Sequence, residues 1–190
     1  ALSGSKVHTY GLANCKFNPV SLATFVESVR WADGALTSIN CLANNFGDDD
    51  LATLLTAIEG TSIRSLCGLT EGQTTVDFSG QNLGPIDCKI IAAEFGFRGF
   101  IAALNSVTVD STGDTKDGYG DWRNGGPKTY TLTAGEEHLE LSSKNLGSAD
   151  VTLVAAWLTT SAGAAVTSMN CLHNPLGEGV HIIIKVFEET

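Results

Sequence analysis

The sequence predicts an α/β fold in which short strands alternate with helices, wound as a right-handed solenoid with a parallel sheet on the concave side and helices on the convex side. Two segments, "LTSINCLANNF" at 36–46 and "VTSMNCLHNPL" at 166–176, are nearly identical. A pattern of apolar residues recurs about every 30 residues. Stretches with the apolar spacing of a helix follow these segments.

Each predicted strand follows one eleven-residue frame. Counting Leu36 as position one, apolar or small residues occupy positions one, four, six and eleven, and Asn44 occupies position nine. Positions four and six point to the same face of a strand, because side chains alternate along it. The polar side chain at position nine is expected to satisfy backbone groups in the following turn. The frame fits at 7–17, 36–46, 73–83, 136–146 and 166–176, and a sixth copy starts at Leu104 and then fails.

Helices are expected after the strands. In "DDDLATLLTAIEG" the apolar residues fall at helical spacing, and three acids stand where a helix N-terminus favours negative charge. In "NPVSLATFVESVRW" Asn18 is the expected cap and Pro19 the first helical residue. We expect helices within 18–31, 48–60, 84–95, 148–158 and 177–189.

The repeats are further organised in pairs. "LTEGQTTVDFSGQNLG" (69–84) matches "LTAGEEHLELSSKNLG" (132–147), and "ALTSINC", "ALNSVTV" and "AVTSMNC" begin at 35, 103 and 165. The chain is therefore expected to be a single domain over residues 1–190, with about six repeats in three double units. The stretch 110–130 is rich in Gly and Asp and is expected to be an irregular loop in place of a helix.

The frame corresponds to L-x-x-L-x-L-x-x-N/C-x-L, and the chain resembles the leucine-rich repeat family across essentially its whole length. A strand and a helix in about 29 residues is similar to the long, helix-containing subclass typified by ribonuclease inhibitor. The resemblance implies a leucine-rich repeat solenoid whose curved sheet face binds partners. Gln81 and Lys144 depart from the family pattern at position nine, and each is followed by an asparagine, Asn82 and Asn145.

Composition restricts the class of function. The net charge is −10, which argues against nucleic-acid binding and permits a basic protein partner. No apolar stretch reaches the length of a membrane span, so no membrane partner is expected. The five cysteines form no C-x-x-C pair, and we interpret them as reduced core thiols in an intracellular, cytoplasmic protein.

Catalytic motifs are not found. The sequence contains no H-E-x-x-H, nucleophile elbow or phosphate loop, so we expect no enzyme, no cofactor and no metal site. His8 and His138 are nearly equivalent in the repeats and are expected to face solvent. The arginines Arg30, Arg64, Arg98 and Arg123 form no recognisable catalytic group.

The loop at 110–130 allows three interpretations. Its four aspartates are compatible with calcium, but their spacing lacks the alternation of a calcium loop. Tyr119 and Trp122 are candidate binding anchors, because exposed aromatics on long loops often contact partners. Alternatively the loop packs down as a cover in place of a helix. Residues 111–128 are expected to be the most mobile or protease-sensitive internal segment, and protection from hydrogen exchange would indicate a packed cover.

The outward strand positions form the second candidate surface, which is polar and mildly acidic. It is interpreted either as a solvated sheet face or as a weak docking surface. The candidate binding residues on it are Thr37, Asn40, Thr75, Asp77, Thr108, His138, Glu140 and Asn170.

These observations favour a non-catalytic protein-binding scaffold or recognition module. The alternatives are a structural subunit of a larger assembly and, with less support, a regulatory protein of the GTPase-activating type. The last helix is followed by no capping repeat, so the C-terminal end is expected to be uncapped, with Val166, Met169, Ile183 and Phe187 open to solvent or to end-to-end self-association.

Overall fold

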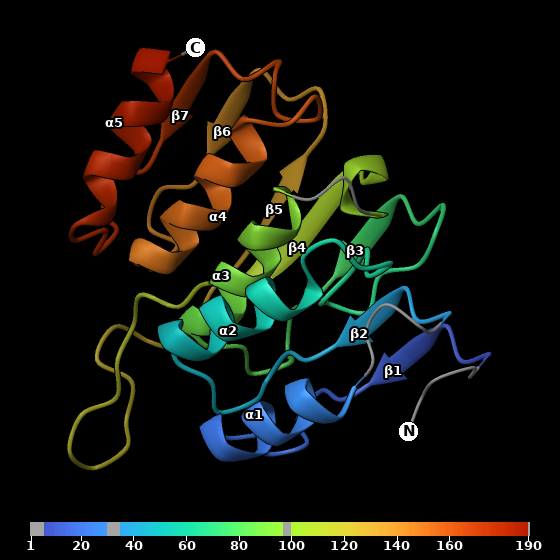
Figure 1. Cartoon of the computed structure of the whole chain (residues 1–190). Helices are drawn as coiled ribbons and strands as arrows, with labels where there is room; N and C mark the ends of the chain where they lie inside the picture. The colour runs from blue at the N-terminus through green and yellow to red at the C-terminus, as the bar shows by residue number, and fades with distance from the viewer. Residues whose placement is uncertain (1–5, 30–34, 97–99, 190) are drawn as a thin grey trace.

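The computed structural model describes residues 6–29, 35–96 and 100–189, and within these the side chains of all but residues 101, 102 and 187–189. Five helices lie in chain order along one side of the molecule and the strands along the other (Figure 1). Each helix contacts the next one in sequence. The elements are β1 (Thr9–Gly11), α1 (Pro19–Ser28), β2 (Ser38–Asn40), α2 (Asp48–Ile58), β3 (Thr75–Asp77), α3 (Pro85–Glu94), a 3-10 helix (Phe100–Ala103), β4 (Ser106–Asp110), β5 (Thr129–Thr133), β6 (His138–Glu140), α4 (Ser148–Leu158), β7 (Ser168–Asn170) and α5 (Gly179–Glu189).

The five predicted helices are confirmed. In each of the first four, the side chain three residues after the cap accepts a hydrogen bond from the backbone N–H of the cap, as Ser21 Oγ does from Asn18 N in α1. Asn18 accepts a hydrogen bond from Ser21 N at the start of α1, and Pro19 is the first helical residue. In α2, α3 and α4 an aspartate three residues after a glycine accepts a hydrogen bond from the glycine N–H. The carboxylate thereby satisfies a backbone donor that has no partner within the helix.

The prediction of a solenoid with a single parallel sheet is wrong. Over the residues described, the strands form three small sheets, in the orders β1-β2, β3-β4-β5 and β6-β7. Within the described strands, β1 with β2, β3 with β4, and β6 with β7 are parallel, but β4 and β5 are antiparallel. The structure contains both helices and strands, as expected. It does not contain the expected continuous concave sheet with a helix behind every strand.

The antiparallel strand β5 arises because no helix follows β4. A parallel neighbour needs a crossover connection, normally a helix, whereas a chain that returns directly pairs antiparallel. Residues 111–128 make such a direct return, and Tyr130 pairs with Val109 in the register. The alternation of Thr with Tyr130 and Leu132 in "TYTLT" was a readable strand signal.

Between β2 and β3 the chain has no regular strand, and the segment 64–68 replaces it. Ile39 N donates to Ser65 O at 2.8 Å and Cys41 N donates to Leu66 O at 2.9 Å. On its other side, the buried carboxylate of Glu94 accepts hydrogen bonds from Ser65 Oγ and from the backbone amides of Leu66 and Cys67. Burial raises the pKa of Glu94, and these donors oppose the rise. A side chain of α3 therefore supplies the pairing that a neighbouring strand would give.

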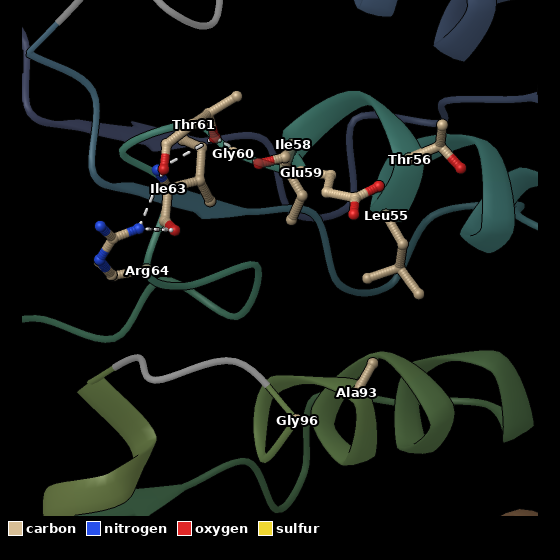
Figure 2. A pocket seen from close by; sticks show the side chains of 10 residues that line it. All are labelled: Leu55, Thr56, Ile58, Glu59, Gly60, Thr61, Ile63, Arg64, Ala93 and Gly96. Carbon is tan, nitrogen blue, oxygen red and sulfur yellow. Dashed lines mark hydrogen bonds between the residues drawn. The ribbon is translucent and has the colours of Figure 1, made fainter.

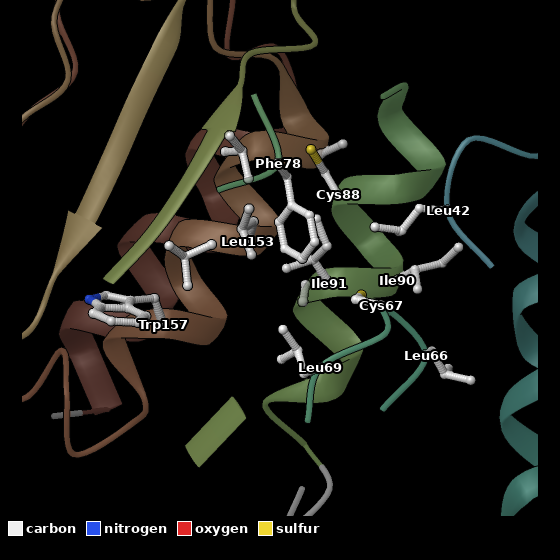
Figure 3. Close-up of a cluster of buried hydrophobic side chains, with 14 of the residues drawn as sticks. Leu42, Leu66, Cys67, Leu69, Phe78, Cys88, Ile90, Ile91, Leu153 and Trp157 are labelled. Carbon is white, nitrogen blue, oxygen red and sulfur yellow. The ribbon is translucent and has the colours of Figure 1, made fainter. Parts of the chain in front are cut away.

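The core lies between the helices and the strands (Figure 3), and it includes Phe78, Leu153 and the fully buried Trp157. Phe95 meets Trp157 edge-on, with ring centroids 5.8 Å apart. The inward strand residues of the repeats lie in or against this core. Leu36, Ile39, Cys41, Phe78, Leu139 and Leu141 are buried, while Val76, Met169 and Cys171 are half-buried.

All five cysteines are free thiols. Cys41, Cys67 and Cys88 are buried and Cys171 is half-buried, but Cys15 is exposed, so the interpretation as core thiols is wrong for Cys15. Burial raises the pKa of the Cys41 thiol to about 12. Among the described residues, no helix has the length and hydropathy needed to cross a membrane.

The asparagines at position nine bond to backbone groups of their own turn, as the sequence predicted, and they also bond to the preceding repeat. Asn44 Nδ2 donates to Leu12 O and Cys41 O, and Asn44 Oδ1 accepts from Phe17 N. Asn174 makes the equivalent bonds to Leu141 O, Cys171 O and the amides of residues 144 and 146. At 81 and 144 the asparagine comes one position later, and Asn145 bonds to the 110–130 loop instead.

Replacing Asn44 with alanine is expected to destabilise the fold more than replacing its exposed neighbour Asn45. Asn44→Ala leaves buried backbone groups unpaired, which costs about 1–3 kcal/mol. Urea denaturation should show that loss for Asn44→Ala and a change within about 0.5 kcal/mol for Asn45→Ala. Equal midpoints for the two variants would show that the amide bridges are dispensable.

Candidate protein-interaction site

The loop between β4 and β5 is built around the carboxylate of Asp114. This side chain is buried and accepts hydrogen bonds from Thr115 N, from Asn124 N and Nδ2, and from Gly126 N. Desolvation would raise the pKa of Asp114, but these N–H donors outweigh it and lower the pKa. The carboxylate therefore stays ionised, and its hydrogen bonds hold the two sides of the loop together.

The base of the loop lies directly on the start of α4. Gly113 N donates to Asn145 O at 2.9 Å, and a Cβ on Gly113 would come within 2.5 Å of the backbone at 145–147. Asn145 Nδ2 donates to Asn124 O and Gly126 O at 3.0 and 2.7 Å. The loop is consequently held at its base by backbone contact that only glycine permits at position 113.

The buried carboxylate of Asp150 completes this attachment. Its Oδ2 atom accepts from Gly147 N, Thr112 N and Thr112 Oγ1, and its Oδ1 atom accepts from Tyr130 OH at 3.1 Å. Burial raises the pKa of Asp150 against the effect of these donors. One side chain thus joins the exit of β4, the strand β5 and the first turn of α4.

The tip of the loop projects from this base, and Figure 1 shows it extending away from the helices. Asp117 Oδ1 accepts from Tyr119 N and Asp121 N, which forms a tight turn. The Tyr119 side chain is 95% exposed and Trp122 is 41% exposed, with Lys116 Nζ 5.0 Å from the Trp122 ring centroid. The structure therefore combines a fixed base with exposed aromatic side chains.

The eight candidate residues on the strands are distributed over three small sheets. Thr37 and Asn40 lie at β2, Thr75, Asp77 and Thr108 on β3 and β4, and His138, Glu140 and Asn170 on β6 and β7. Several of these side chains bond to one another or to nearby backbone. The bonds are Thr37 Oγ1 to His8 O, Leu42 N to Asn40 Oδ1, Ser79 N to Asp77 Oδ1, Thr108 Oγ1 with Thr131 Oγ1, His138 Nδ1 with Ser168 Oγ, and Asn170 Nδ2 to Glu140 Oε2.

His138 and Ser168 form a hydrogen-bonded pair with the residue types of a nucleophile and its base. Their Nδ1 and Oγ atoms are 2.7 Å apart. A working pair needs a third group that orients the histidine. The acid on the same strand, Glu140, instead accepts from Asn170 and from Ser142 N. The hydrogen bonds from Ser142 are the main cause that lowers the pKa of Glu140. The Glu140 carboxylate is therefore bonded to Ser142 and Asn170, and not to His138.

A cavity of about 470 Å³ lies between the C-terminal parts of α2 and α3 (Figure 2). Leu55, Ile58 and Ala93 contribute its apolar wall. Arg64 is at its rim, but Arg64 Nη1 donates to Thr61 O and Ile63 O, so the guanidinium is committed to backbone carbonyls. Arg30 and Arg98 lie outside the described residues.

Metal binding finds no support in the part of the chain that the structure describes, where no group of three or more His, Cys, Asp or Glu side chains could hold an ion. Asp114, the buried acid of the loop, accepts hydrogen bonds from the backbone N–H groups of Asn124 and Gly126.

The comparisons with known proteins identify no relative: no family model, no curated protein and no solved structure matches this chain.

The sequence pointed to Tyr119 and Trp122 but not to the residues that hold them. The sequence signal for these residues was weak. Asp114 is one of four aspartates in the loop, and Asn145 is displaced by one position from the repeat frame. Their partners lie on segments that only folding brings together.

Replacing Asp114 with alanine should open the loop. The variant loses a charged acceptor for several amides, so limited proteolysis within 115–126 should be at least about tenfold faster than in the wild type. Asp121→Ala is the matched control, because Asp121 is exposed and only its backbone takes part in the turn. Equal cleavage of wild type and Asp114→Ala would show that the loop is open without this anchor.

Proposed function

We propose that this chain is a non-catalytic protein-binding module and that the tip of the 110–130 loop is its principal contact. The observation that carries the proposal is Tyr119, whose side chain is 95% exposed on a loop anchored by Asp114 and Asn145. Tyrosine and tryptophan are the residue types that most often dominate protein interfaces.

The anchored base makes such a contact favourable. A loop that must be ordered on binding pays a conformational cost, and a loop already held by hydrogen bonds pays less. Asp117 Oδ1 accepts from the backbone N–H groups of Tyr119 and Asp121, which fixes the turn that carries Tyr119, and Lys116 Nζ lies over the ring of Trp122. The two aromatic side chains are thus presented on a preformed turn.

The charge of the chain favours a basic protein partner. The net charge is −10. On the sheet face, Ser79 bonds lower the pKa of Asp77, and Ser142 bonds lower that of Glu140, so both carboxylates remain ionised at neutral pH. Such a field accelerates encounter with a positively charged partner and disfavours nucleic acid.

The resemblance of the repeats to the leucine-rich repeat family supports a binding role, since members of that family bind proteins, although the three separate sheets differ from the single sheet of the expected solenoid. The free thiols support an intracellular, cytoplasmic location. A structural subunit is the second candidate, which the exposed apolar side chains Leu172 and Ile184 favour.

Replacing Tyr119 with alanine should weaken partner binding by about tenfold or more, as expected for an aromatic anchor. The partner is first captured on immobilised wild-type protein from the source cells and identified by mass spectrometry, and its affinity for each variant is then measured. Val20→Ala is the control, because Val20 is also exposed but lies on α1. A partner that binds wild type and Tyr119→Ala equally would overturn the loop tip as the contact.

A further inference from the structure

A second cavity, of about 540 Å³, lies among the turns that lead from strand to helix in three repeats. The turn after β1 contributes Asn14, the turn after β2 contributes Asn45, and the turn after β3 contributes Asn82. The volume is within the range of small-molecule sites, about 300–1,000 Å³. The three repeats thus build one concave site that is separate from the 110–130 loop.

Two buried polar side chains line this cavity and hold its turns in place. The carboxamide of Asn44 bonds to backbone groups of two successive turns. Asp87 Oδ1 accepts from Ala43 N at 2.7 Å, and its Oδ2 atom accepts from Gly84 N at 2.8 Å. These bonds fix the turns to one another, so the shape of the cavity does not depend on a ligand.

Other polar side chains at this cavity are not used by the described part of the chain. The described residues supply no hydrogen-bond partner for the side chains of Asn14, Lys16, Asn45 and Asn82. The backbone amides of Asn14 and Asn45, in contrast, donate to carbonyl groups of neighbouring turns at 3.0 and 2.9 Å. A ligand would therefore meet polar groups on a backbone that is already ordered, which lowers the cost of binding.

The chemistry of the free side chains matches hydroxyl groups. A carboxamide offers both N–H donors and a carbonyl acceptor, and a hydroxyl likewise donates and accepts. A sugar presents several hydroxyls at short spacing, which suits three carboxamides that line one cavity. Phe46 and Ile86 add apolar surface to the lining, against which the C–H groups of a sugar ring can pack.

An ion is a poorer match for this cavity. Among the described residues that line it, Lys16 alone is cationic, and the chain carries a net charge of −10, so an anion is weakly attracted. Asp87 is the acid of the lining, and both of its oxygen atoms already accept amide N–H groups. The lining therefore favours a neutral ligand.

We propose that this cavity binds a neutral mono- or disaccharide through the carboxamides of Asn14, Asn45 and Asn82, with the Lys16 ammonium as a further donor. The observation that carries the proposal is the gathering of these unused polar side chains around a cavity whose turns are fixed by Asn44 and Asp87. The site shares no residue with the 110–130 loop and does not depend on the function proposed for that loop.

The test is a titration of the isotope-labelled full chain with glucose, galactose, mannose, N-acetylglucosamine, maltose and cellobiose, followed by NMR. The side-chain NH₂ signals of Asn45 and Asn82 should shift and saturate with at least one of these sugars. The signal of Asn105, an exposed asparagine outside the cavity, should not move. Added salt should leave the shifts unchanged, because a neutral ligand is not screened.

Two variants remove a carboxamide from the cavity without straining the backbone. Asn82 has a φ of 56°, which glycine adopts readily, so Asn82→Gly keeps the turn. Asn82→Gly and Asn45→Ala should each weaken binding of the saturating sugar at least about tenfold. Asn105→Ala, the matched control, should bind as the wild type does.

Three results would overturn the proposal. In the first, none of the six sugars gives saturating shifts. In the second, the shifts saturate but both Asn82→Gly and Asn45→Ala bind the sugar as tightly as the wild type. In the third, inorganic phosphate moves the same signals in a salt-sensitive manner and the sugars do not, which would make the cavity an anion site. If a variant does not fold, the shifts in the wild type decide.

Discussion

The carboxylate of Asp150 does more than cap a helix, because it also joins the exit of β4 and the strand β5 to the first turn of α4. It caps α4 through Gly147 N, as the equivalent aspartates cap α2 and α3. It also binds Thr112 and Tyr130, which belong to the exit of β4 and to β5. These bonds matter because, among the described residues, β5 and β6 are not paired in a sheet. A buried acid with several donors can replace backbone pairing at such a break.

Buried carboxylates also join elements between β2 and β3, where strand pairing is interrupted a second time. Asp87 caps α3 through Gly84 N and also accepts from Ala43 N at 2.7 Å, and Glu94 at the far end of α3 binds the irregular segment 65–67. Helices thus hold strands through side-chain carboxylates where regular pairing stops. At Asp150 this arrangement fixes the base of the 110–130 loop, which leaves its tip free to present Tyr119.

The sequence predicted the helices and the repeat frame well, because both depend on local spacing. Asn44 and Asn174 were expected to satisfy turn backbone, and they do. The single parallel sheet was wrong, because the repeat pattern does not encode the direction of the strand that follows an irregular loop. The anchoring roles of Asp114 and Asp150 also depend on partners 10 to 38 residues away, which periodicity cannot reveal. For the candidate site, the exposed aromatic residues were readable, whereas the residues that hold their loop were not.

A comparison of Asp150→Asn with Asp50→Asn tests the central claim most directly. Both aspartates cap a helix through the glycine three residues earlier, at 2.8 Å, but in the part of the chain that is described only Asp150 also binds neighbouring elements. In urea denaturation at neutral pH, Asp50→Asn should lose about 1 kcal/mol or less, the usual value of a cap. Asp150→Asn should lose about 3 kcal/mol or more, as expected when a buried charged network is broken. Equal losses for the two variants would contradict the account, because the bonds from Asp150 to Thr112 and Tyr130 would then contribute nothing.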